Sequence, residues 1–377
     1  MNRYLIADFD GALLCGLRDE KRPLTFDLYR REEALSSYPD ANSEIRRGDI
    51  FIAKVKRILR AQRCAFCDVS PGRSCFLPLD RGSVLYADGH RSGKDGSDLR
   101  EGAEVLVQIA KDAHTGKKPV LSSFFVFPEY DDPRAQIRQI LETAKTRTCY
   151  TRLYRAPSAL VRDLLSLDQE ALEMIRTDDA EVFRALQEDP FLQATGLDRK
   201  LSLYTDDYPL TKLYALRSGL EEALVKRVRL KSGTELVIEH TEAFWTVDVN
   251  SAKSAAAADR SRKIVAKEDA VLRTNLEAAS ELALQLRLRN MSGIIVVDFI
   301  NMREEESREA VTLALREACE ADPAGVHLGG FTAFGLFELS RKRTRPALYE
   351  QVANARKNTR ENMREICVKS RKILEFP

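Results

Sequence analysis

The sequence predicts a multidomain protein of the α+β or α/β class that contains a small closed β-barrel. Its 377 residues correspond to two or three domains. Short apolar stretches separated by turn residues follow one another over residues 49–127, whereas helical spacing of apolar residues marks residues 133–195 and 213–230. Beyond residue 232, apolar strands alternate with amphipathic helices, which is the pattern of a sheet built with helical crossovers.

The composition excludes several classes of protein. Hydrophobic residues make up 44% of the chain and charged residues 31%, so large cores can form and a disordered chain is excluded. Seven scattered cysteines do not suggest a disulfide scaffold. There is no apolar run of about 18 residues and no hydrophobic run of a signal peptide, so we expect a cytoplasmic protein without a membrane span.

The first half of the chain contains a few N-terminal strands, then a barrel, and then helices. Apolar stretches at 4–7, 13–17 and 24–28 read as strands that are too few for a core, so we expect them to pair with a later segment. The period-two pattern of residues 49–58 indicates a half-buried strand. Four further strands complete the expected five-stranded closed barrel: 64–69, 75–79, 104–109 and 120–127.

The second half of the chain predicts a mixed sheet. Leu272, Leu276, Ala279, Ala283 and Leu286 recur at helical spacing and mark an amphipathic helix between two strands. The second of these strands, 294–300, is almost wholly apolar, which predicts burial on both faces. The remaining expected elements are a strand at 235–239, a strand at 244–250, a helix at about 305–321, two short strands at 326–328 and 335–339, and a helical tail from 341.

Two aspartates interrupt the apolar strands of this sheet. Asp248 and Asp298 each stand inside a run of apolar residues, where a carboxylate is costly unless it is paired, hydrogen-bonded or bound to a metal. A crossover helix between the strands would place both aspartates near one edge, an arrangement that suits Mg²⁺. Asn250, on the same strand face as Asp248, would orient a carboxylate or a water. The alternative is that each aspartate satisfies a turn or caps a helix.

The barrel offers aromatic side chains on adjacent strands. Phe66 and Phe76 would lie side by side, with Lys118 on the next turn. Aromatic side chains beside a basic groove are how barrels of this size hold single-stranded nucleic acid. The alternative is that both phenylalanines belong to the barrel core.

The end of the sequence is basic. From residue 341 onward there are 11 Lys and Arg against 4 Asp and Glu, although the whole chain carries a formal charge of only +2. The run Ser340-Arg-Lys-Arg-Thr-Arg345, and in particular Arg341 and Arg343, would bind phosphate groups by charge, or else forms a solvated helix start. Cys64 and Cys67 have zinc-ligand spacing but lack a second pair, so we expect no zinc site there.

Long motifs in the sequence resemble one known family. Thr241-Glu-Ala-Phe-Trp-Thr-Val-Asp-Val-Asn-Ser251, Gly293-Ile-Ile-Val-Val-Asp-Phe-Ile-Asn-Met302 and Phe334-Gly-Leu-Phe-Glu-Leu-Ser-Arg-Lys-Arg-Thr-Arg-Pro346 occur in the order found in the ribonuclease E/G family. The resemblance is dense over residues 212–350. Ala65-Phe-Cys-Asp-Val69, Phe76-Leu-Pro-Leu79 and residues 99–109 similarly match the S1-type RNA-binding domain of that family.

The resemblance implies a domain organisation. An RNase H-like subdomain would combine residues 1–38 with 150–222, and an S1-type OB-fold barrel would be inserted at 39–127. A DNase I-like catalytic domain would follow at 223–350, with a basic C-terminal helix at 351–377. Residues 128–149 would be the remnant of a domain that senses a 5′-monophosphate in the family, so we do not expect a preference for 5′-monophosphorylated RNA.

The resemblance also implies an activity, a Mg²⁺-dependent endoribonuclease that cleaves single-stranded RNA and leaves 5′-phosphate and 3′-hydroxyl ends. Asp248 and Asp298 would bind Mg²⁺, with Mn²⁺ as a possible substitute, and Asn250 would support Asp248. Phe66, Phe76 and Lys118 would grip RNA next to the scissile site. The family's Cys-Pro-x-Cys zinc link does not occur in the sequence, so we expect no zinc and a monomer or a dimer held without zinc.

Two rival functions remain open at this stage. The first is a non-catalytic S1-type RNA-binding protein derived from the family, which the joint presence of Asp248, Asn250 and Asp298 disfavours. The second is a Mg²⁺ phosphohydrolase that acts on DNA or on a small phosphate ester, which the barrel disfavours.

Overall fold

The computed structural model describes residues 1–35, 45–80, 82–93, 96–111, 118–127, 133–251 and 263–357. The chain forms two compact units. The first unit comprises residues 1–31, 168–184 and 200–377, and the second comprises residues 32–167 and 185–199. Within the described residues, no helix is both long enough and apolar enough to cross a membrane.

The first unit contains a five-stranded N-terminal sheet with the strand order β12-β11-β1-β2-β3. Its central strand β1 runs parallel to β11 and antiparallel to β2. The expectation that the first strands pair with a later segment is therefore confirmed. The strands are β1 (Asn2–Phe9), β2 (Ala12–Arg18), β3 (Pro23–Arg30), β11 (Leu172–Thr177) and β12 (Leu201–Leu203).

Helices cover one face of the N-terminal sheet. Leu5, Leu14 and Phe26 pack against Leu216 and Leu220 of α7 (Leu216–Leu224), which follows the short α6 (Leu210–Leu213). The same cluster includes Leu288, Leu348 and Val352, so this core continues into the segments that flank the second sheet of the unit. The helical stretch expected over residues 213–230 forms α7 and the end of α6, separated at Ala215, which has a φ of 52°. Its last residues form the strand β13 (Arg227–Arg229) instead.

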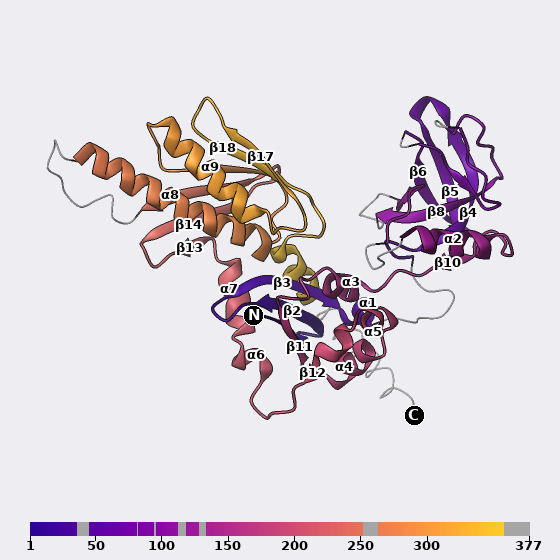
Figure 1. Cartoon of the computed structure of the whole chain (residues 1–377), viewed down its shortest axis with the longest axis horizontal. Coiled ribbons are helices and arrows are strands. Elements are labelled where there is room, and N and C mark those ends of the chain that lie inside the picture. The colour runs from indigo at the N-terminus through magenta and orange to yellow at the C-terminus, as the bar shows by residue number, and fades with distance from the viewer. Residues whose placement is uncertain are drawn as a thin grey trace, which may run out of the picture. The chain divides into compact units, whose positions relative to one another are not determined.

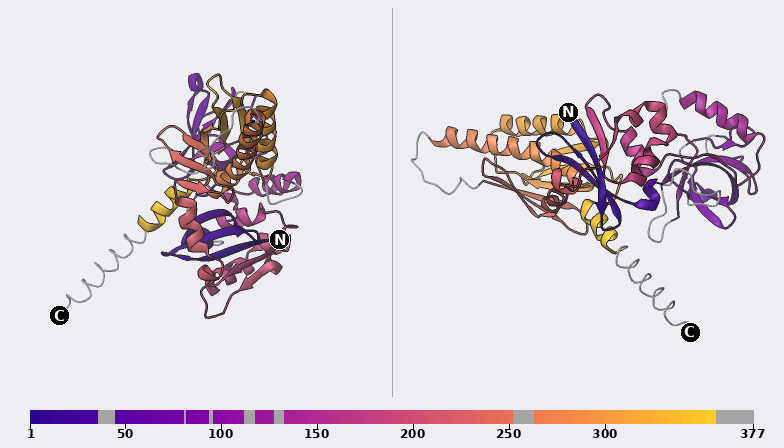
Figure 2. Two further views of the ribbon diagram at one scale, coloured as in Figure 1. Left: turned by 90° about the vertical axis from the view of Figure 1, so that its left-hand side faces the viewer. Right: turned by 90° about the horizontal axis from the view of Figure 1, so that it is seen from below.

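The second unit contains the predicted barrel, visible as the purple strands labelled β4, β5, β6 and β8 in Figure 1 and seen from two further sides in Figure 2. Its strands follow the order β4-β5-β6-β9-β8, and a pairing of β4 with β8 closes the cylinder. A closed five-stranded barrel is consistent with an OB-fold, as expected. The strands are β4 (Ile50–Leu59), β5 (Cys64–Ser70), β6 (Arg73–Pro78), β8 (Glu104–Lys111) and β9 (Val120–Ser122).

Short elements complete this unit. The predicted helical spacing after the barrel forms α2 (Pro133–Ala144), whose Ile140 and Ala144 are buried. The edge strand β10 (Arg152–Tyr154) pairs with β4, and the rings of Tyr154 and Phe127 meet edge to face with centroids 5.1 Å apart. The other short elements are β7 (Leu85–Tyr86), α3 (Ala159–Leu165) and α5 (Pro190–Thr195); α1 (Arg31–Leu35) and α4 (Ala180–Gln187) span the unit boundaries.

The second sheet of the first unit, which we call the C-terminal sheet, has six strands in the order β13-β14-β15-β16-β18-β17. Strands β15 and β16 are parallel and the other pairs are antiparallel. The elements are β13 (Arg227–Arg229), β14 (Thr234–His240), β15 (Trp245–Ser251), α8 (Lys263–Leu288), β16 (Gly293–Asp298), α9 (Glu305–Cys319), β17 (Val326–Phe331) and β18 (Phe337–Arg341).

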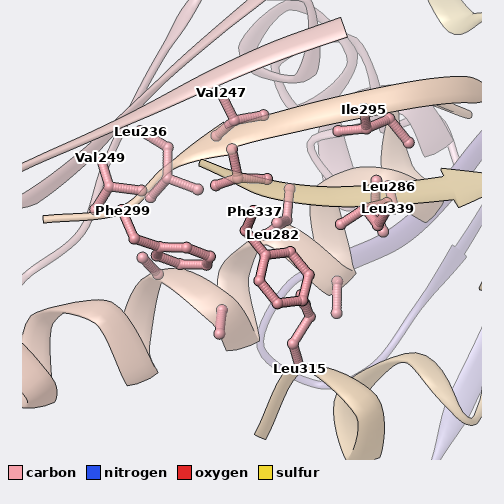
Figure 3. Packing of buried hydrophobic residues seen from close by; sticks show 14 of the residues in the cluster. Leu236, Val247, Val249, Leu282, Leu286, Ile295, Phe299, Leu315, Phe337 and Leu339 are labelled. Carbon is pink, nitrogen blue, oxygen red and sulfur yellow. The ribbon is translucent and has the colours of Figure 1, made fainter. Parts of the chain in front are cut away.

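Two helices pack on one face of the C-terminal sheet, as Figure 3 shows. Leu282 and Leu286 of α8 and Leu315 of α9 meet Val247 of β15 and Phe337 of β18, and all five side chains are buried. Both helices are expected from the sequence, α8 because of its amphipathic spacing. The parallel alignment of β15 and β16 is made possible by α8, which carries the chain back along the sheet.

The strand β16 differs from the prediction that it is buried on both faces. Its burial alternates, so that Ile295 and Val297 are buried whereas Ile294 is 57% exposed and Asp298 is exposed. The reason is that α8 and α9 cover the inner face of the sheet, while the described residues leave the outer face of β16 open. An almost wholly apolar strand in a mixed sheet can therefore be covered on one face only.

Residues with a positive φ lie at the end of α8 and at the start of β16. Asn290 has a φ of 49° and Gly293 a φ of 87°, conformations that terminate a helix and reverse the chain. After β18 the chain forms a helix over residues 348–357. The expected helical tail thus begins later than Arg341, which belongs to β18, and residues 358–377 of the predicted basic helix lie outside the described residues.

Candidate functional site

Asp248 and Asp298 lie next to each other at the carboxyl end of the parallel pair. Strand pairing aligns Asp248 of β15 directly with Asp298 of β16. The neighbours Val247, Val249 and Val297 point into the core, so both aspartates project from the open face of the sheet. The predicted common sheet edge is therefore confirmed. The expectation that the two carboxylates are buried inside apolar strands is wrong, because both are exposed to solvent.

Asn250 lies on the same face as the aspartates and holds one of them. Its Nδ2 donates a hydrogen bond of 2.7 Å to Oδ2 of Asp248, as expected from their spacing of two residues along one strand. A shallow pocket at this edge is lined by Asp248, Asn250 and Asp298 together with Ser251 and Ile300. Sequence reasoning did not single out Ser251, since nothing distinguishes a serine at the end of a strand.

The donor set of this pocket fits a hard divalent cation. Two like charges placed directly opposite on neighbouring strands repel each other. Among the described residues no Lys or Arg forms a salt bridge with Asp248 or Asp298, and no cluster of three or more His, Cys, Asp or Glu converges on a metal position. Mg²⁺ is commonly held by one or two carboxylates with waters and substrate phosphate, so the residues present match its needs.

In the barrel the three predicted RNA contacts come together. Phe66 of β5 and Phe76 of β6 are directly paired, and their rings meet edge to face with centroids 5.9 Å apart. The Nζ of Lys118 lies 4.9 Å from the centroid of the Phe66 ring, a distance typical of a cation–π contact. Both phenylalanines are half-buried on the outside of the barrel and neither belongs to its core, so the core alternative does not hold.

Replacing Phe66 with alanine is expected to weaken binding of single-stranded RNA by about 5- to 100-fold, the range for loss of one aromatic stacking partner. The measurement is fluorescence anisotropy of a labelled A/U-rich RNA in EDTA. Phe124→Ala is the matched control, because Phe124 is also a barrel-unit phenylalanine and is 50% exposed. Equal loss of affinity in both variants would refute a specific role for Phe66.

Arg341 does not lie on an RNA-accessible surface. Only 6% of the residue is exposed, and its Nε and Nη2 donate hydrogen bonds of 2.7 and 3.0 Å to the two oxygens of Asp322. Its Nη1 donates to Oδ1 of Asn290 at 2.8 Å and to the carbonyl of Met291. The expected phosphate contact is corrected to a structural role, in which Arg341 ties the end of β18 to the turns after α8 and α9.

The remaining candidates from the sequence are the basic Arg343 and the cysteines of the barrel. Arg343 is exposed and pairs with Glu350 at 3.1 Å, so its contact with RNA stays a prediction. Cys64, Cys67 and Cys75 are buried in the barrel as free thiols. Burial raises the pKa of Cys67 to about 12 and that of Cys75 to about 11, which keeps both protonated at neutral pH.

The sequence is similar to known proteins of one family. The sequence model of the Ribonuclease E/G family matches residues 127–344. Ribonuclease G of Escherichia coli (strain K12) is 34% identical over 372 residues, covering 81% of this chain and 75% of that protein. Ribonuclease G of Haemophilus influenzae is 37% identical over 213 residues, covering 56% of this chain and 42% of that protein.

Ribonuclease E of Escherichia coli (strain K12) is 29% identical over 373 residues. That alignment covers 81% of this chain but only 34% of the longer relative. The chain thus spans about a third of one relative and three quarters of another. Since the family model covers more than half of the sequence, the chain belongs to the ribonuclease E/G family.

Proposed function

We propose that the protein is a Mg²⁺-dependent endoribonuclease that cleaves single-stranded RNA and leaves 5′-phosphate and 3′-hydroxyl ends. The observation that carries the proposal is the aligned pair Asp248 and Asp298 on the open face of a sheet, with Asn250 bonded to Asp248. Membership of the family and the names of its relatives, ribonucleases E and G, support an activity on RNA.

The chain's own residues would supply the geometry of the reaction. Asp248 and Asp298 would hold Mg²⁺, or Mn²⁺ in its place, between adjacent strands. The amide of Asn250 donates to one oxygen of Asp248 and would hold this side chain in place at the pocket that it lines. When bound there, Mg²⁺ would favour deprotonation of an attacking water and offset the negative charge that develops on the phosphoryl oxygens.

The barrel supports single-stranded RNA as the substrate. Phe66 and Phe76 offer aromatic faces to unpaired bases, and Lys118 places a positive charge beside them. Bases in a duplex are stacked on one another and cannot reach such faces, so this surface favours single strands.

We also propose the finer domain assignments. The RNase H-like subdomain of residues 1–38 and 150–222 is supported by the N-terminal sheet, which joins β1 to β11 and β12. The DNase I-like domain of residues 223–350 is supported by the mixed C-terminal sheet with its two covering helices. The assignment of residues 39–127 as S1-type is supported by the closed barrel, and the described part of residues 128–149 contains the helix α2.

The rival functions differ from this proposal in their chemistry. A non-catalytic RNA-binding protein has no need of two unneutralised carboxylates placed side by side, which cost folding energy without a cation. A phosphohydrolase of a small ester has no use for the aromatic pair on the barrel. An enzyme acting on single-stranded DNA would use the pair as well, and against it stand the names of the relatives, ribonucleases E and G.

A cleavage assay on the full chain separates the three functions. The substrates are one sequence as single-stranded RNA, duplex RNA and single-stranded DNA, each with Mg²⁺ or with EDTA. We expect cleavage of the single-stranded RNA alone, and only with Mg²⁺. Binding without cleavage in any condition would establish the binding protein, and equal cleavage of DNA would establish the wider phosphohydrolase.

A further inference from the structure

One aromatic side chain is left almost fully in solvent. Phe334 occupies the turn between β17 and β18 and is 94% exposed, more than any other large apolar side chain among the described residues. A single exposed apolar residue is ordinary on a protein surface and proves nothing by itself. The position and the rigidity of this turn distinguish Phe334 from other exposed apolar residues.

The turn lies at the sheet edge that carries the two aspartates. Val297 of β16 pairs with Phe337 of β18, so the residues that precede Phe337 continue past Asp298 beyond the carboxyl end of β16. The opposite end of the hairpin, where Val326 pairs with Arg341, is at the other edge. From the usual rise and spacing of strands, Phe334 stands on the order of 10 Å from Asp298, which is a distance of one or two nucleotides.

The turn is held in one conformation. The backbone N–H of Thr332 donates to the carbonyl of Leu336 at 2.7 Å, and that of Gly335 donates to the carbonyl of Thr332 at 2.9 Å. Oγ1 of Thr332 accepts a further hydrogen bond from the Leu336 N–H. Gly335 has a φ of 83°, a conformation that a glycine adopts without strain. A preformed turn presents an aromatic ring with little further loss of entropy on binding.

We propose that Phe334 stacks on a base of the RNA one or two nucleotides from the scissile phosphate and thereby helps to select the cleavage site. The inference rests on the proposed function, because it takes the edge with Asp248 and Asp298 as the site of cleavage. Stacking on one ring tolerates every base but favours an unpaired one. The exposed Arg303, in the loop after β16, adds a positive charge near this edge for the backbone.

The first test measures stacking without cleavage. Short single-stranded RNAs, each with one 2-aminopurine at a different position, are bound in EDTA to the full-length wild type, Phe334→Ala and Phe334→Trp. We expect quenching at one position that is lost in the alanine variant and kept in the tryptophan variant, with an affinity about tenfold lower for the alanine variant. Phe244→Ala is the matched control, since Phe244 is 37% exposed and precedes β15 at the opposite edge.

A second test identifies the base by a double-mutant cycle. An abasic nucleotide at the quenched position should weaken binding to the wild type as much as Phe334→Ala does, and should add nothing further in that variant. Additive losses at every position, or an unchanged affinity of Phe334→Ala, would overturn the proposal. So would a change in the sedimentation of Phe334→Ala with RNA binding intact, because the turn would then be a contact between copies of the chain. A wild type that shows the quenching but never cleaves would refute the proposed function and not the stacking.

Discussion

Asp298→Asn is expected to lower the rate of RNA cleavage by about three orders of magnitude while the affinity for RNA in EDTA stays within twofold of the wild type. The amide keeps the shape of the side chain but removes the charge that would hold a divalent cation beside Asp248. Loss of one main electrostatic contributor to a transition state costs a factor of about 10²–10³ or more. Single-turnover cleavage of an A/U-rich RNA and anisotropy provide the two measurements.

The control for this variant is Glu242→Gln, which removes an exposed carboxylate from the turn before β15, at the opposite edge of the same sheet. We expect it to cleave at the wild-type rate. Asp248→Asn should behave as Asp298→Asn does, since the two carboxylates act on one cation. Cleavage by Asp298→Asn at an undiminished rate would remove the aspartate pair from the mechanism.

The second large effect concerns stability. Arg341→Met is expected to lower the free energy of unfolding of the C-terminal sheet by about 3–5 kcal/mol, because it leaves the buried carboxylate of Asp322 without its partner. Trp245, the only tryptophan in the sequence, is buried in β15 and reports the unfolding of this sheet in urea by its fluorescence.

Arg343→Met is the matched control for the stability experiment. Arg343 is two residues away and pairs with Glu350 in solvent, where an ion pair contributes at most about 1 kcal/mol. The double variant Arg341→Met with Asp322→Leu should recover part of the loss, since it no longer leaves a buried charge unpaired. Equal, small effects of Arg341→Met and Arg343→Met would contradict the structural role.

The sequence predicted those features that depend on local pattern. The period-two run of β4 and the following turns indicated the barrel, and the helical spacing of α8 between two apolar strands indicated the parallel pair. From that pair the shared edge of Asp248 and Asp298 followed. The pairing of Phe66 with Phe76 was also predictable, because consecutive antiparallel strands place such residues side by side.

Features that depend on tertiary contacts were not predictable in the same way. Which face of β16 is covered depends on where α8 and α9 pack, and an apolar strand gives no sign of this. Arg341 belongs to a basic run in the sequence, although its alternation with Phe337 and Leu339 places it on the inward face of β18. The position of Phe334 near Asp298 depends on the register between β18 and β16, which cannot be derived from the sequence pattern.

We propose that RNA is hydrolysed at this sheet edge with the help of a divalent cation that Asp248 and Asp298 would hold. The most direct measurement titrates Mg²⁺ into the EDTA-treated wild-type chain, follows single-turnover cleavage of a single-stranded RNA and identifies the product ends by mass spectrometry. We predict no cleavage without metal, a saturable rise with Mg²⁺, and 5′-phosphate and 3′-hydroxyl ends. Undiminished cleavage in EDTA would show that no metal is needed, and 2′,3′-cyclic phosphate ends would show that the ribose hydroxyl is the nucleophile; either result would contradict this proposal.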